Sequence, residues 1–357
     1  MSKHTKSDLL QMQSLPLSAK IRMTERRIRD WYDYWDGEVY VSFSGGKDST
    51  VLLDLVRNLY PDVEAVFVDT GLEYPEIREF VKTFDNVTIL RPEMSFVDVI
   101  KKYGYPMIRK EVSNVVYEAK RLKPGRTKTI RMQKLEGTLL DKEGNKSRYN
   151  CEKYKPLLHT DFLIASNCCN VMKKAPAKAF TKTSNKKPIL GQLADESRLR
   201  MQKWMQNGCN GFEMKTPVSN PMAFWTENDV LQYIKEKNLE IASVYGSVEY
   251  AIDPEQIRWS EIDSALGIFE TKEVKKLTTT GCDRTGCIFC GFGCHLEKEP
   301  SRFQRLKETH PRQYRYCIEG GEYNEEGIWQ PNKNGLGMGH VFDELNKLYG
   351  EDFIKYK

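Results

Sequence analysis

A six-residue string, Ser44-Gly-Gly-Lys-Asp-Ser49, constrains the fold of this chain more than any other feature. It lies between an apolar segment at 38–43, which predicts a buried strand, and a helix expected over 50–59. Further strands and helices are expected to alternate after it, at 63–68, 74–83 and 87–90. Strands that alternate with helices through short links predict a parallel sheet with helices on both faces.

The rest of the chain fits an α/β fold, in which we expect a mostly parallel sheet of about five strands. The alternation resumes at Pro188–Gly191, and Thr226 is positioned to cap a helix at 227–237. Helices are also expected near both ends of the chain, at 17–35 and 341–349.

Composition excludes several classes of protein. No run of about 18 consecutive apolar residues occurs, so the sequence predicts no transmembrane helix. The first residues lack the apolar core of a secretory signal, and we expect a cytoplasmic protein. Nine cysteines in a chain of 357 residues are an odd number, which argues against a disulfide framework and favours metal binding or thiol chemistry.

Positive charge is concentrated in one segment. Residues 101–155 contain 16 Lys or Arg and 6 Asp or Glu, a net charge of +10, whereas the whole chain has a net charge of +5. The remainder of the chain is therefore slightly acidic. Such asymmetry predicts a surface for a polyanion, although a lysine-rich insertion that faces solvent explains it equally well.

The string at 44–49 has the chemistry of an anion cradle. Its two glycines allow the backbone to approach a ligand closely, and its amides lead into a helix. Lys47 adds a positive charge, Asp48 could hold a metal ion bound to phosphates, and the two serines add hydroxyl donors. The spacing is not that of the Walker motif. The candidate contacts are Ser44, Gly45, Gly46, Lys47, Asp48 and Ser49.

The cysteines offer two overlapping sets of metal ligands. The first set joins an adjacent pair to a Cys-x2-Cys pair: Cys168, Cys169, Cys287 and Cys290. The second is a local cluster within thirteen residues: Cys282, Cys287, Cys290 and Cys294. Four thiolates suit an iron–sulfur cubane, and the compact set would also suit a zinc ion.

These strings resemble a known family. SFSGGKDST resembles the PP-loop of the adenine nucleotide α-hydrolase-like superfamily, whose members cleave ATP between the α and β phosphates. Other strings resemble motifs of its phosphoadenosine phosphosulfate (PAPS) reductase-like branch: Val68–Pro75, Cys168-Cys169 with Lys173, Lys174 and Pro176, Ile189–Arg198, and Pro221–Val230. Gly281–Cys290 is similar to the segment that binds a [4Fe-4S] cluster in assimilatory adenylyl-sulfate reductases. The matches run in order over about residues 38–294.

The resemblance implies roles for individual residues. Lys47 and Asp48 are expected to be catalytic, and the other nucleotide contacts expected beyond the loop are Asp69, Thr70, Gly71 and Arg198. The implied cofactors are ATP, Mg²⁺ and a [4Fe-4S] cluster on the first cysteine set, with zinc as the less favoured metal. The expected segments are a helical segment at 1–36, a PP-loop domain at 37–250 with a basic insertion at about 105–155, and a cysteine-rich region at 251–357.

Three departures from the family pattern bear on the reaction. The PP-loop is complete, whereas it is degraded in the sulfonucleotide reductases. A Glu-Cys-Gly-Leu-His-like tail with a nucleophilic cysteine is not found, and the chain reads Pro300–Pro311 instead. Leu193 replaces the arginine expected two residues after Gly191, so that anion contact is missing or is made by Arg198 or Arg200.

The leading hypothesis is therefore an ATP-dependent PP-loop enzyme of sulfur metabolism with an iron–sulfur cluster. Its acceptor would be a nucleic acid, tRNA or DNA, if the basic segment at 101–155 binds a polyanion. The alternatives are a PAPS or adenylyl-sulfate reductase and a non-catalytic nucleotide-binding partner in a multi-protein system. A homodimer or a multi-protein sulfur-modification system is the expected assembly.

Several other side chains receive structural interpretations. We expect Cys317 in the core rather than as a nucleophile, and His295 on a loop surface. His310-Pro311 predicts the end of a helix. Core aromatic residues are expected at Trp204, Trp225 and Trp259.

Overall fold

The computed structural model describes residues 3–122, 129–263 and 268–357, with the backbone alone over 253–263 and 268–275. The chain forms two compact units, and each is discontinuous in sequence. Unit 1 contains Met1–Asp69, Glu73–Leu90 and Ala177–Thr285, and unit 2 contains Thr70–Leu72, Arg91–Pro176 and Gly286–Lys357. The division into segments at 1–36, 37–250 and 251–357, which we expected from the sequence, stays a prediction.

Unit 1 is built on a six-stranded sheet with the order β3-β2-β1-β5-β7-β6. Its strands are β1 (Val39–Ser42), β2 (Ala65–Val68), β3 (Val87–Leu90), β5 (Lys187–Leu190), β6 (Asn210–Gly211) and β7 (Val218–Ser219). Every neighbouring pair is parallel except β6 with β7. The predicted α/β class with a mostly parallel sheet is confirmed. Strands β6 and β7, at one edge of the sheet, are each two residues long. They are too short to leave an apolar pattern in the sequence.

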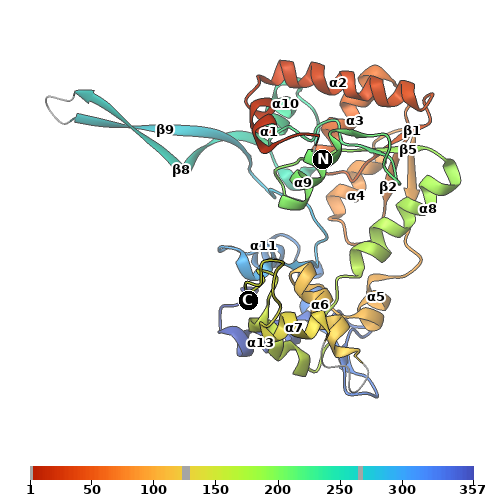
Figure 1. The fold of residues 1–357 in the computed structure, drawn as a ribbon, viewed down its shortest axis with the longest axis vertical. Helices are drawn as coiled ribbons and strands as arrows, with labels where there is room; N and C mark the ends of the chain where they lie inside the picture. Colours follow the sequence, from red (N-terminus) through yellow and green to blue (C-terminus); the bar gives the residue numbers. More distant parts are fainter. Residues whose placement is uncertain (1–2, 123–128, 264–267) are drawn as a thin grey trace. The chain divides into compact units, whose positions relative to one another are not determined.

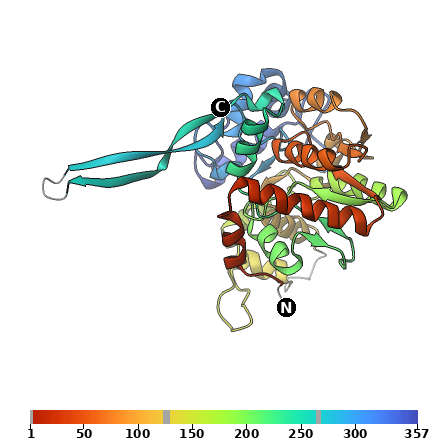
Figure 2. The same cartoon turned by 90° about the horizontal axis from the view of Figure 1, so that it is seen from above.

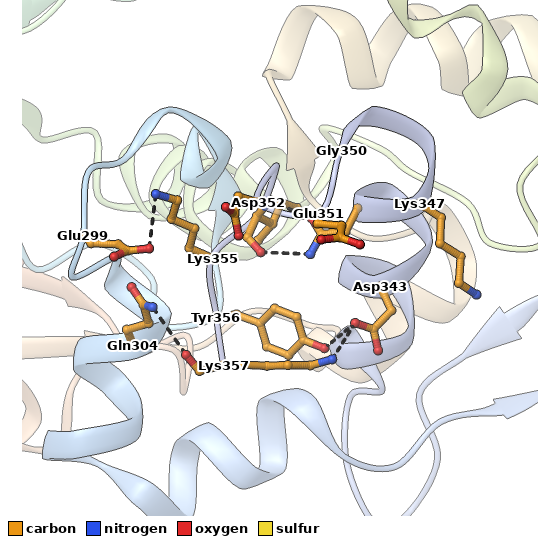
Figure 3. A pocket seen from close by; sticks show the side chains of 12 residues that line it. Glu299, Gln304, Asp343, Lys347, Gly350, Glu351, Asp352, Lys355, Tyr356 and Lys357 are labelled. Carbon is orange, nitrogen blue, oxygen red and sulfur yellow. Dashed lines mark hydrogen bonds and ion pairs between the residues drawn. The ribbon is translucent and has the colours of Figure 1, made fainter.

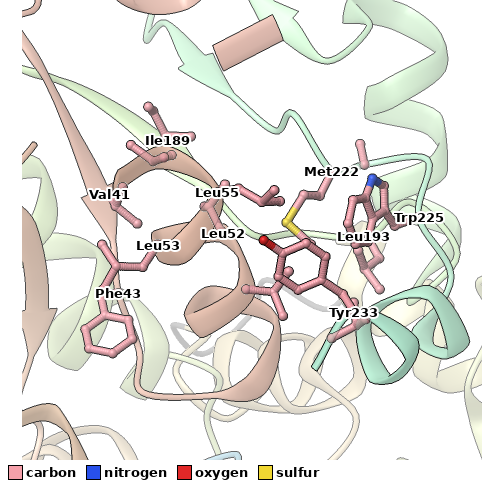
Figure 4. Packing of buried hydrophobic residues seen from close by; sticks show 14 of the residues in the cluster. Val41, Phe43, Leu52, Leu53, Leu55, Ile189, Leu193, Met222, Trp225 and Tyr233 are labelled. Atoms are coloured by element: carbon pink, nitrogen blue, oxygen red, sulfur yellow. The ribbon is translucent and has the colours of Figure 1, made fainter. Parts of the chain in front are cut away.

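Helices cover both faces of this sheet. Val41 on β1 and Phe43 after it pack with Leu53 in one buried cluster (Figure 4). Tyr40 points to the opposite face, where its hydroxyl lies 2.9 Å from the Thr181 hydroxyl. The helices of unit 1 are α1 (Lys6–Gln13), α2 (Leu17–Tyr34), α3 (Lys47–Leu59), α4 (Pro75–Lys82), α8 (Ala175–Ser184, begun in unit 2), α9 (Arg198–Asn207), α10 (Glu227–Lys237) and the 3-10 turn η3 (Ser243–Tyr245) (Figure 1).

Local signals explain where these helices begin. Helix α3 begins at Lys47, before the predicted Thr50, because Gly46 is extended and ends the loop as the N-cap. Helix α10 follows the prediction: the Thr226 hydroxyl accepts from the Asp229 amide, and the Asp229 carboxylate accepts from the Thr226 amide. This reciprocal cap fixes the first turn of α10.

A long two-stranded antiparallel ribbon was not expected from the sequence. It consists of β8 (Val248–Asp263) and β9 (Ile268–Thr279), which pair only with each other over their described residues (Figures 1 and 2). Its base lies against α10, where the Lys235 ammonium lies 4.7 Å from the centre of the Tyr250 ring.

Unit 2 contains short elements around its own core. Buried residues such as Met107, Phe162 and Phe342 are fully enclosed. Over its described residues, the basic insertion contains helices. The elements are α5 (Phe96–Tyr103), β4 (Met107–Ile108), α6 (Lys110–Lys120), α7 (Ile130–Glu136), η1 (Glu152–His159), the π-turn η2 (Asn170–Lys174), β10 (Gly291–Phe292), η4 (Cys294–Leu296), α11 (Arg302–Thr309), α12 (Pro311–Ile318), β11 (Glu322–Tyr323), β12 (Trp329–Gln330) and α13 (Met338–Tyr349).

The structural interpretations of single residues have mixed outcomes. Cys317, Trp204 and Trp225 are buried as predicted, while Trp259 lies outside the described side chains. The surface position expected for His295 is wrong, because both of its ring nitrogens are buried and its ring packs 5.0 Å from Phe353. The helix end predicted at His310 is confirmed by the break between α11 and α12. None of the helices in the described part of the chain has the length and apolar character needed to cross a membrane.

Candidate functional site

The loop between β1 and α3 has a backbone that only glycine allows at one position. Gly45 has a φ of +69°, and a Cβ there would lie 2.8 Å from methyl carbons of both Ile77 and Val81 on α4. Gly45 therefore meets two needs at once, since it permits the left-handed turn and the close approach of α4. The result is a tight loop whose amides lead directly into the start of α3.

The serine hydroxyls hold the shape of this loop. The Ser49 hydroxyl donates to the Gly46 carbonyl at 2.8 Å, and its oxygen accepts from the Ser44 amide at 3.1 Å. The Ser44 and Ser49 hydroxyls also lie 3.0 Å apart. These bonds make both serines part of the loop scaffold. Their predicted contact with a nucleotide stays a prediction.

Lys47 and Asp48 line a cavity of about 230 Å³ in unit 1. Lys47 is buried, and its ammonium lies 2.9 Å from the Glu227 carboxylate and 2.9 Å from the Asp283 carbonyl. The lining residues are Lys47, Asp48, Leu193, Asp195, Glu196, Glu227 and Arg284. The cavity is therefore lined by two cationic side chains and four carboxyl groups. The charge of these groups limits which ligands the cavity can hold.

Burial and neighbouring charges act in opposite directions on this pair. Burial would lower the pKa of Lys47, but the carboxylates of Asp48 and Glu227 raise it above its ordinary value. Burial raises the pKa of Asp48, and the nearby Lys47 only partly offsets that effect. Lys47 is therefore a firmly charged cation, whereas Asp48 carries a charge that a bound metal ion would stabilise.

The arginine near this cavity is not the one that the sequence favoured. Arg198 is exposed at the first turn of α9, and its role as a nucleotide contact stays a prediction. Arg284 pairs with Glu196 at 3.1 Å, and Arg200 forms an ion pair with the same carboxylate. The arginine that lines the cavity is Arg284, which lies just before Cys287 in the sequence.

The motif after β2 is divided between the two units. Asp69 belongs to unit 1, where its carboxylate pairs with Arg78 at 3.1 Å. Thr70 and Gly71 belong to unit 2, where the Thr70 hydroxyl oxygen accepts from the Leu72 amide at 3.2 Å. The predicted nucleotide contacts of these three residues stay predictions.

Unit 2 brings the first cysteine set together. Four thiols line one small apolar cavity, in company with Leu72, Phe96 and Lys173. The cysteines are Cys168, Cys169, Cys287 and Cys290. The second set is not brought together: Cys282 belongs to unit 1, and Cys294 is buried with its thiol 3.0 Å from the Gly291 carbonyl.

Local structure explains how distant cysteines meet. Cys169 directly precedes the π-turn η2, an irregular turn that redirects the side chains of adjacent residues. On the other side, β10 pairs with β4, and the Gly293 amide donates to the Ile108 carbonyl at 2.8 Å. Arg302 fixes the same loop, because its guanidinium donates to the Cys290 carbonyl at 2.9 Å.

The adjacent cysteines differ in acidity. A hydrogen bond from Cys168 lowers the pKa of Cys169 to about 5, with help from Lys110 and Lys173. The pKa of Cys168 is raised by the same hydrogen bond and by burial. The pair is therefore one thiol and one thiolate, with cations nearby to balance negative sulfur.

The donor set fits an iron–sulfur cluster in its chemistry. Four thiols in one apolar cavity supply the number and type of ligand that such a cluster takes. Lys110 and Lys173 lie near Cys169. The space among them is about 20 Å³, so the side chains must rotate outward to admit any inorganic group. Among described residues, no group of three or more His, Cys, Asp or Glu stands at the spacing for a single metal ion.

A larger pocket lies elsewhere in unit 2, around the last residues of the chain (Figure 3). Its volume is about 720 Å³, but its charged groups pair with one another. Lys355 lies 3.1 Å from Glu299, and Lys357 lies 3.0 Å from Asp343. None of the candidate site residues named from the sequence lines this pocket, and it is not the candidate active site.

Sequence reasoning missed four residues that the structure places around Lys47: Tyr245, Glu227, Glu196 and Arg284. Three of them lie in strings that the family resemblance quoted, so a signal was present. Tyr245 lies in no quoted string, and nothing in the sequence alone points to it.

Comparison with known proteins places this geometry in context. A family model described as the phosphoadenosine phosphosulfate reductase domain matches residues 38–137 and 126–291. An adenosine 5'-phosphosulfate reductase from Staphylococcus epidermidis is 26% identical over 213 residues, which cover 58% of this chain and 65% of that protein. The reductase of the same name from Staphylococcus haemolyticus is 24% identical over 272 residues, which cover 75% of this chain and 84% of that protein.

A solved structure is also similar. It is the phosphoadenylyl-sulfate reductase from Candida auris, with 14% sequence identity and a TM-score of 0.35. The match covers 64% of this chain and 91% of that one. The chain spans less than two thirds of the length of the S. epidermidis relative.

Proposed function

Because this chain belongs to the phosphoadenosine phosphosulfate reductase domain family, we propose that it is an ATP-dependent enzyme of sulfur metabolism. It binds ATP with Mg²⁺ at the loop 44–49 and cleaves the nucleotide between the α and β phosphates. It then transfers sulfur with the help of an iron–sulfur cluster held by the four cysteines of unit 2.

The charge balance around Lys47 carries this proposal. Four carboxyl groups and two cations line the cavity, so a multiply charged anion without a metal ion would meet net repulsion there. A nucleotide bound with a divalent cation would not, because the metal ion prefers carboxylate oxygens as ligands. Asp48, at the start of α3, is the carboxylate best placed in sequence to contact such a metal ion.

In the proposed reaction, an oxygen of the acceptor attacks the α phosphorus of ATP. The bond between the α phosphorus and the bridging oxygen breaks, and pyrophosphate leaves with the electron pair. Lys47, the loop amides and Arg284 would balance the charge that develops on the phosphate oxygens. The products of this step are an adenylated acceptor and pyrophosphate.

The cysteines of unit 2 would hold the cluster through Cys168, Cys169, Cys287 and Cys290. A bound cluster would supply redox chemistry or a labile sulfur for the replacement of AMP. Lys110 and Lys173 would offset the negative charge of the thiolates, as they already do for Cys169.

Reduction of a sulfonucleotide is the second candidate function. The similar proteins from two Staphylococcus species, both called adenosine 5'-phosphosulfate reductase, favour it, as does the cysteine cavity. Its difficulty is the nucleophile. Cys317 is fully buried, and burial raises the pKa of its thiol, so it is unsuited to attack a substrate.

The acceptor in the leading proposal is a nucleic acid, tRNA or DNA, bound by the basic segment 101–155. A homodimer or a multi-protein system for sulfur modification is the proposed assembly. The net charge of +10 over residues 101–155 supports a polyanion partner.

Calorimetry with ATP plus Mg²⁺, adenylyl sulfate and PAPS tests the proposed function. We expect the protein to bind ATP with Mg²⁺ more tightly than either sulfonucleotide, and Lys47→Ala to abolish that binding. Tight binding of adenylyl sulfate or PAPS without measurable ATP binding would instead support the reductase.

A further inference from the structure

The backbone amide and the ammonium of Lys47 would both donate hydrogen bonds to a bound phosphate. In this structure both already have acceptors within the protein. The Lys47 amide donates to the Tyr245 hydroxyl at 3.2 Å. Its ammonium contacts the Glu227 carboxylate and the Asp283 carbonyl, both at 2.9 Å. Only 5% of the Lys47 side chain is exposed. The anion cradle is therefore closed by internal acceptors.

Two of these acceptors belong to one packed assembly. We call residues 281–285 the strap. Its Gly281 amide donates to the Tyr245 carbonyl and its Cys282 amide to the Val244 carbonyl, each at 2.9 Å. At its other end, the Thr285 hydroxyl lies 2.6 Å from the Tyr245 hydroxyl. Tyr245 and the strap thus cover Lys47 together.

The packing between strap and turn η3 is close. A Cβ at Gly281 would lie 2.5 Å from the Val244 carbonyl oxygen, so only glycine allows the strap to approach. A Cβ at Gly46 would lie 3.2 Å from the Tyr245 hydroxyl and 3.5 Å from that of Thr285. The two hydroxyls therefore lie directly over the loop at Gly46.

We propose that Tyr245 and the strap form an autoinhibitory plug that must leave Lys47 before a phosphate ligand can bind. The identity of that ligand rests on the proposed function, whereas the plug itself rests on the contacts above. The acceptors of the plug are a hydroxyl and a carbonyl, which are neutral. A phosphate oxygen is a stronger acceptor for a cation and displaces them when it binds.

The plug lowers the apparent affinity of the site. A ligand that binds only the open state has its dissociation constant divided by the open fraction. Removal of one hydrogen bond that holds the closed state raises the open fraction, by roughly 3- to 10-fold for a bond of ordinary strength. A residue that contacts the ligand would have the opposite effect when it is truncated.

The test compares Tyr245→Phe with Tyr233→Phe in the full chain. Both tyrosines are buried in unit 1, and the Tyr233 hydroxyl donates to Asp54, away from the loop 44–49. The probes are inorganic pyrophosphate and ATP, each with Mg²⁺, measured by calorimetry. We expect Tyr245→Phe to bind both probes roughly 3- to 10-fold more tightly and Tyr233→Phe to match the unsubstituted protein. If the unsubstituted protein binds a probe, an unchanged or weaker affinity of Tyr245→Phe for that probe overturns the plug.

A second measurement tests the plug in the absence of any nucleotide. Amine-reactive labelling followed by mass spectrometry reports how fast the Lys47 ammonium becomes accessible in the ligand-free protein. Tyr245→Phe and Thr285→Val should each speed this labelling several-fold, and Tyr233→Phe should not. Faster labelling with no binding of ATP or pyrophosphate by any variant would retain the plug and reject the proposed function. Unchanged labelling in both variants would reject the plug.

Discussion

The Glu227 carboxylate lies 2.9 Å from the Lys47 ammonium, and the two side chains differ sharply in exposure, at 59% and 5%. Glu227 is the first residue of α10, while Lys47 is the first residue of α3. Two helix starts therefore meet with opposite charges at the candidate phosphate site. A negative side chain there competes with a phosphate for the same cation.

Glu227→Gln should increase the affinity for ATP or pyrophosphate, each with Mg²⁺. The change keeps the size of the side chain and removes the charge that neutralises Lys47 and repels phosphate. We expect roughly a tenfold decrease in the dissociation constant, which corresponds to about 1.4 kcal/mol. Calorimetry provides the measurement.

The matched control for this change is Glu236→Gln, which removes a charge from an exposed position on the same helix. It should leave the affinity unchanged. Weaker binding by Glu227→Gln would show that Glu227 contacts the ligand or its metal ion instead of opposing it.

The sequence predicted the parts of the site that are local in the chain. Gly45, Lys47 and Asp48 follow one another, and the strand and helix on either side have clear apolar patterns, so their positions were expected. The Tyr245 hydroxyl meets the Lys47 amide from 198 positions away in sequence. No period or motif encodes such a contact, because it depends on how η3 and the strap pack.

Other parts of the fold were missed for different physical reasons. The ribbon β8–β9 has strands of 16 and 12 residues that pair with each other and not with the six-stranded sheet. The alternation of strands and helices from which the sheet was predicted therefore gives no signal for it. The edge strands β6 and β7 are too short to leave a pattern. The sequence alone could not choose between the two sets of four cysteines, since Cys287 and Cys290 occur in both.

Iron content should follow the cysteines that line the cavity of unit 2. Anaerobically prepared protein is expected to contain about four iron atoms per chain, as a cubane requires. Cys168→Ala, Cys169→Ala, Cys287→Ala and Cys290→Ala should each lose the iron and its visible absorbance. Iron analysis and absorption spectra check this result.

Cys282→Ala and Cys294→Ala are the controls for the iron measurement, because their thiols lie outside that cavity. Both should keep their iron. Loss of iron in Cys294→Ala with retention in Cys168→Ala would support the compact set, and zinc in place of iron would reject the cluster.

Binding of nucleic acid by the basic segment should depend on its exposed side chains. Lys142, Lys146, Arg148 and Lys155 are exposed in unit 2, and their joint replacement by serine should weaken binding of tRNA or duplex DNA. Each lost phosphate contact should reduce the slope of log affinity against log salt by roughly 0.7 to 0.9. Filter binding across a salt series provides the measurement.

Arg26 and Lys82 provide the control for that experiment, as both are exposed in unit 1. Replacement of these two residues should leave the salt dependence intact. A failure of the unsubstituted protein to bind either nucleic acid at low salt would reject the nucleic-acid acceptor and leave the segment as solvated surface.

Lys120 belongs to the basic segment but has a structural role. Its ammonium donates to the Thr160 and Phe162 carbonyls at 2.9 and 2.8 Å and to the Thr160 hydroxyl at 3.1 Å. Lys120→Met would leave these acceptors without their donor, and we expect a loss of about 1–3 kcal/mol in the free energy of unfolding. Urea unfolding should show this loss, whereas Lys142→Met, at an exposed site, should stay close to the unsubstituted protein.

The pH dependence of this stability separates Lys120 from an ordinary surface lysine. Burial lowers the pKa of Lys120 to about 8 in the folded protein, below its ordinary value of 10.5. Between these two values the unfolded chain binds more protons than the folded chain, so this residue makes the free energy of unfolding rise with pH. The stability difference between the unsubstituted protein and Lys120→Met should therefore grow from pH 8 to pH 10. A difference that stays constant over this range would show that the Lys120 ammonium keeps its ordinary pKa.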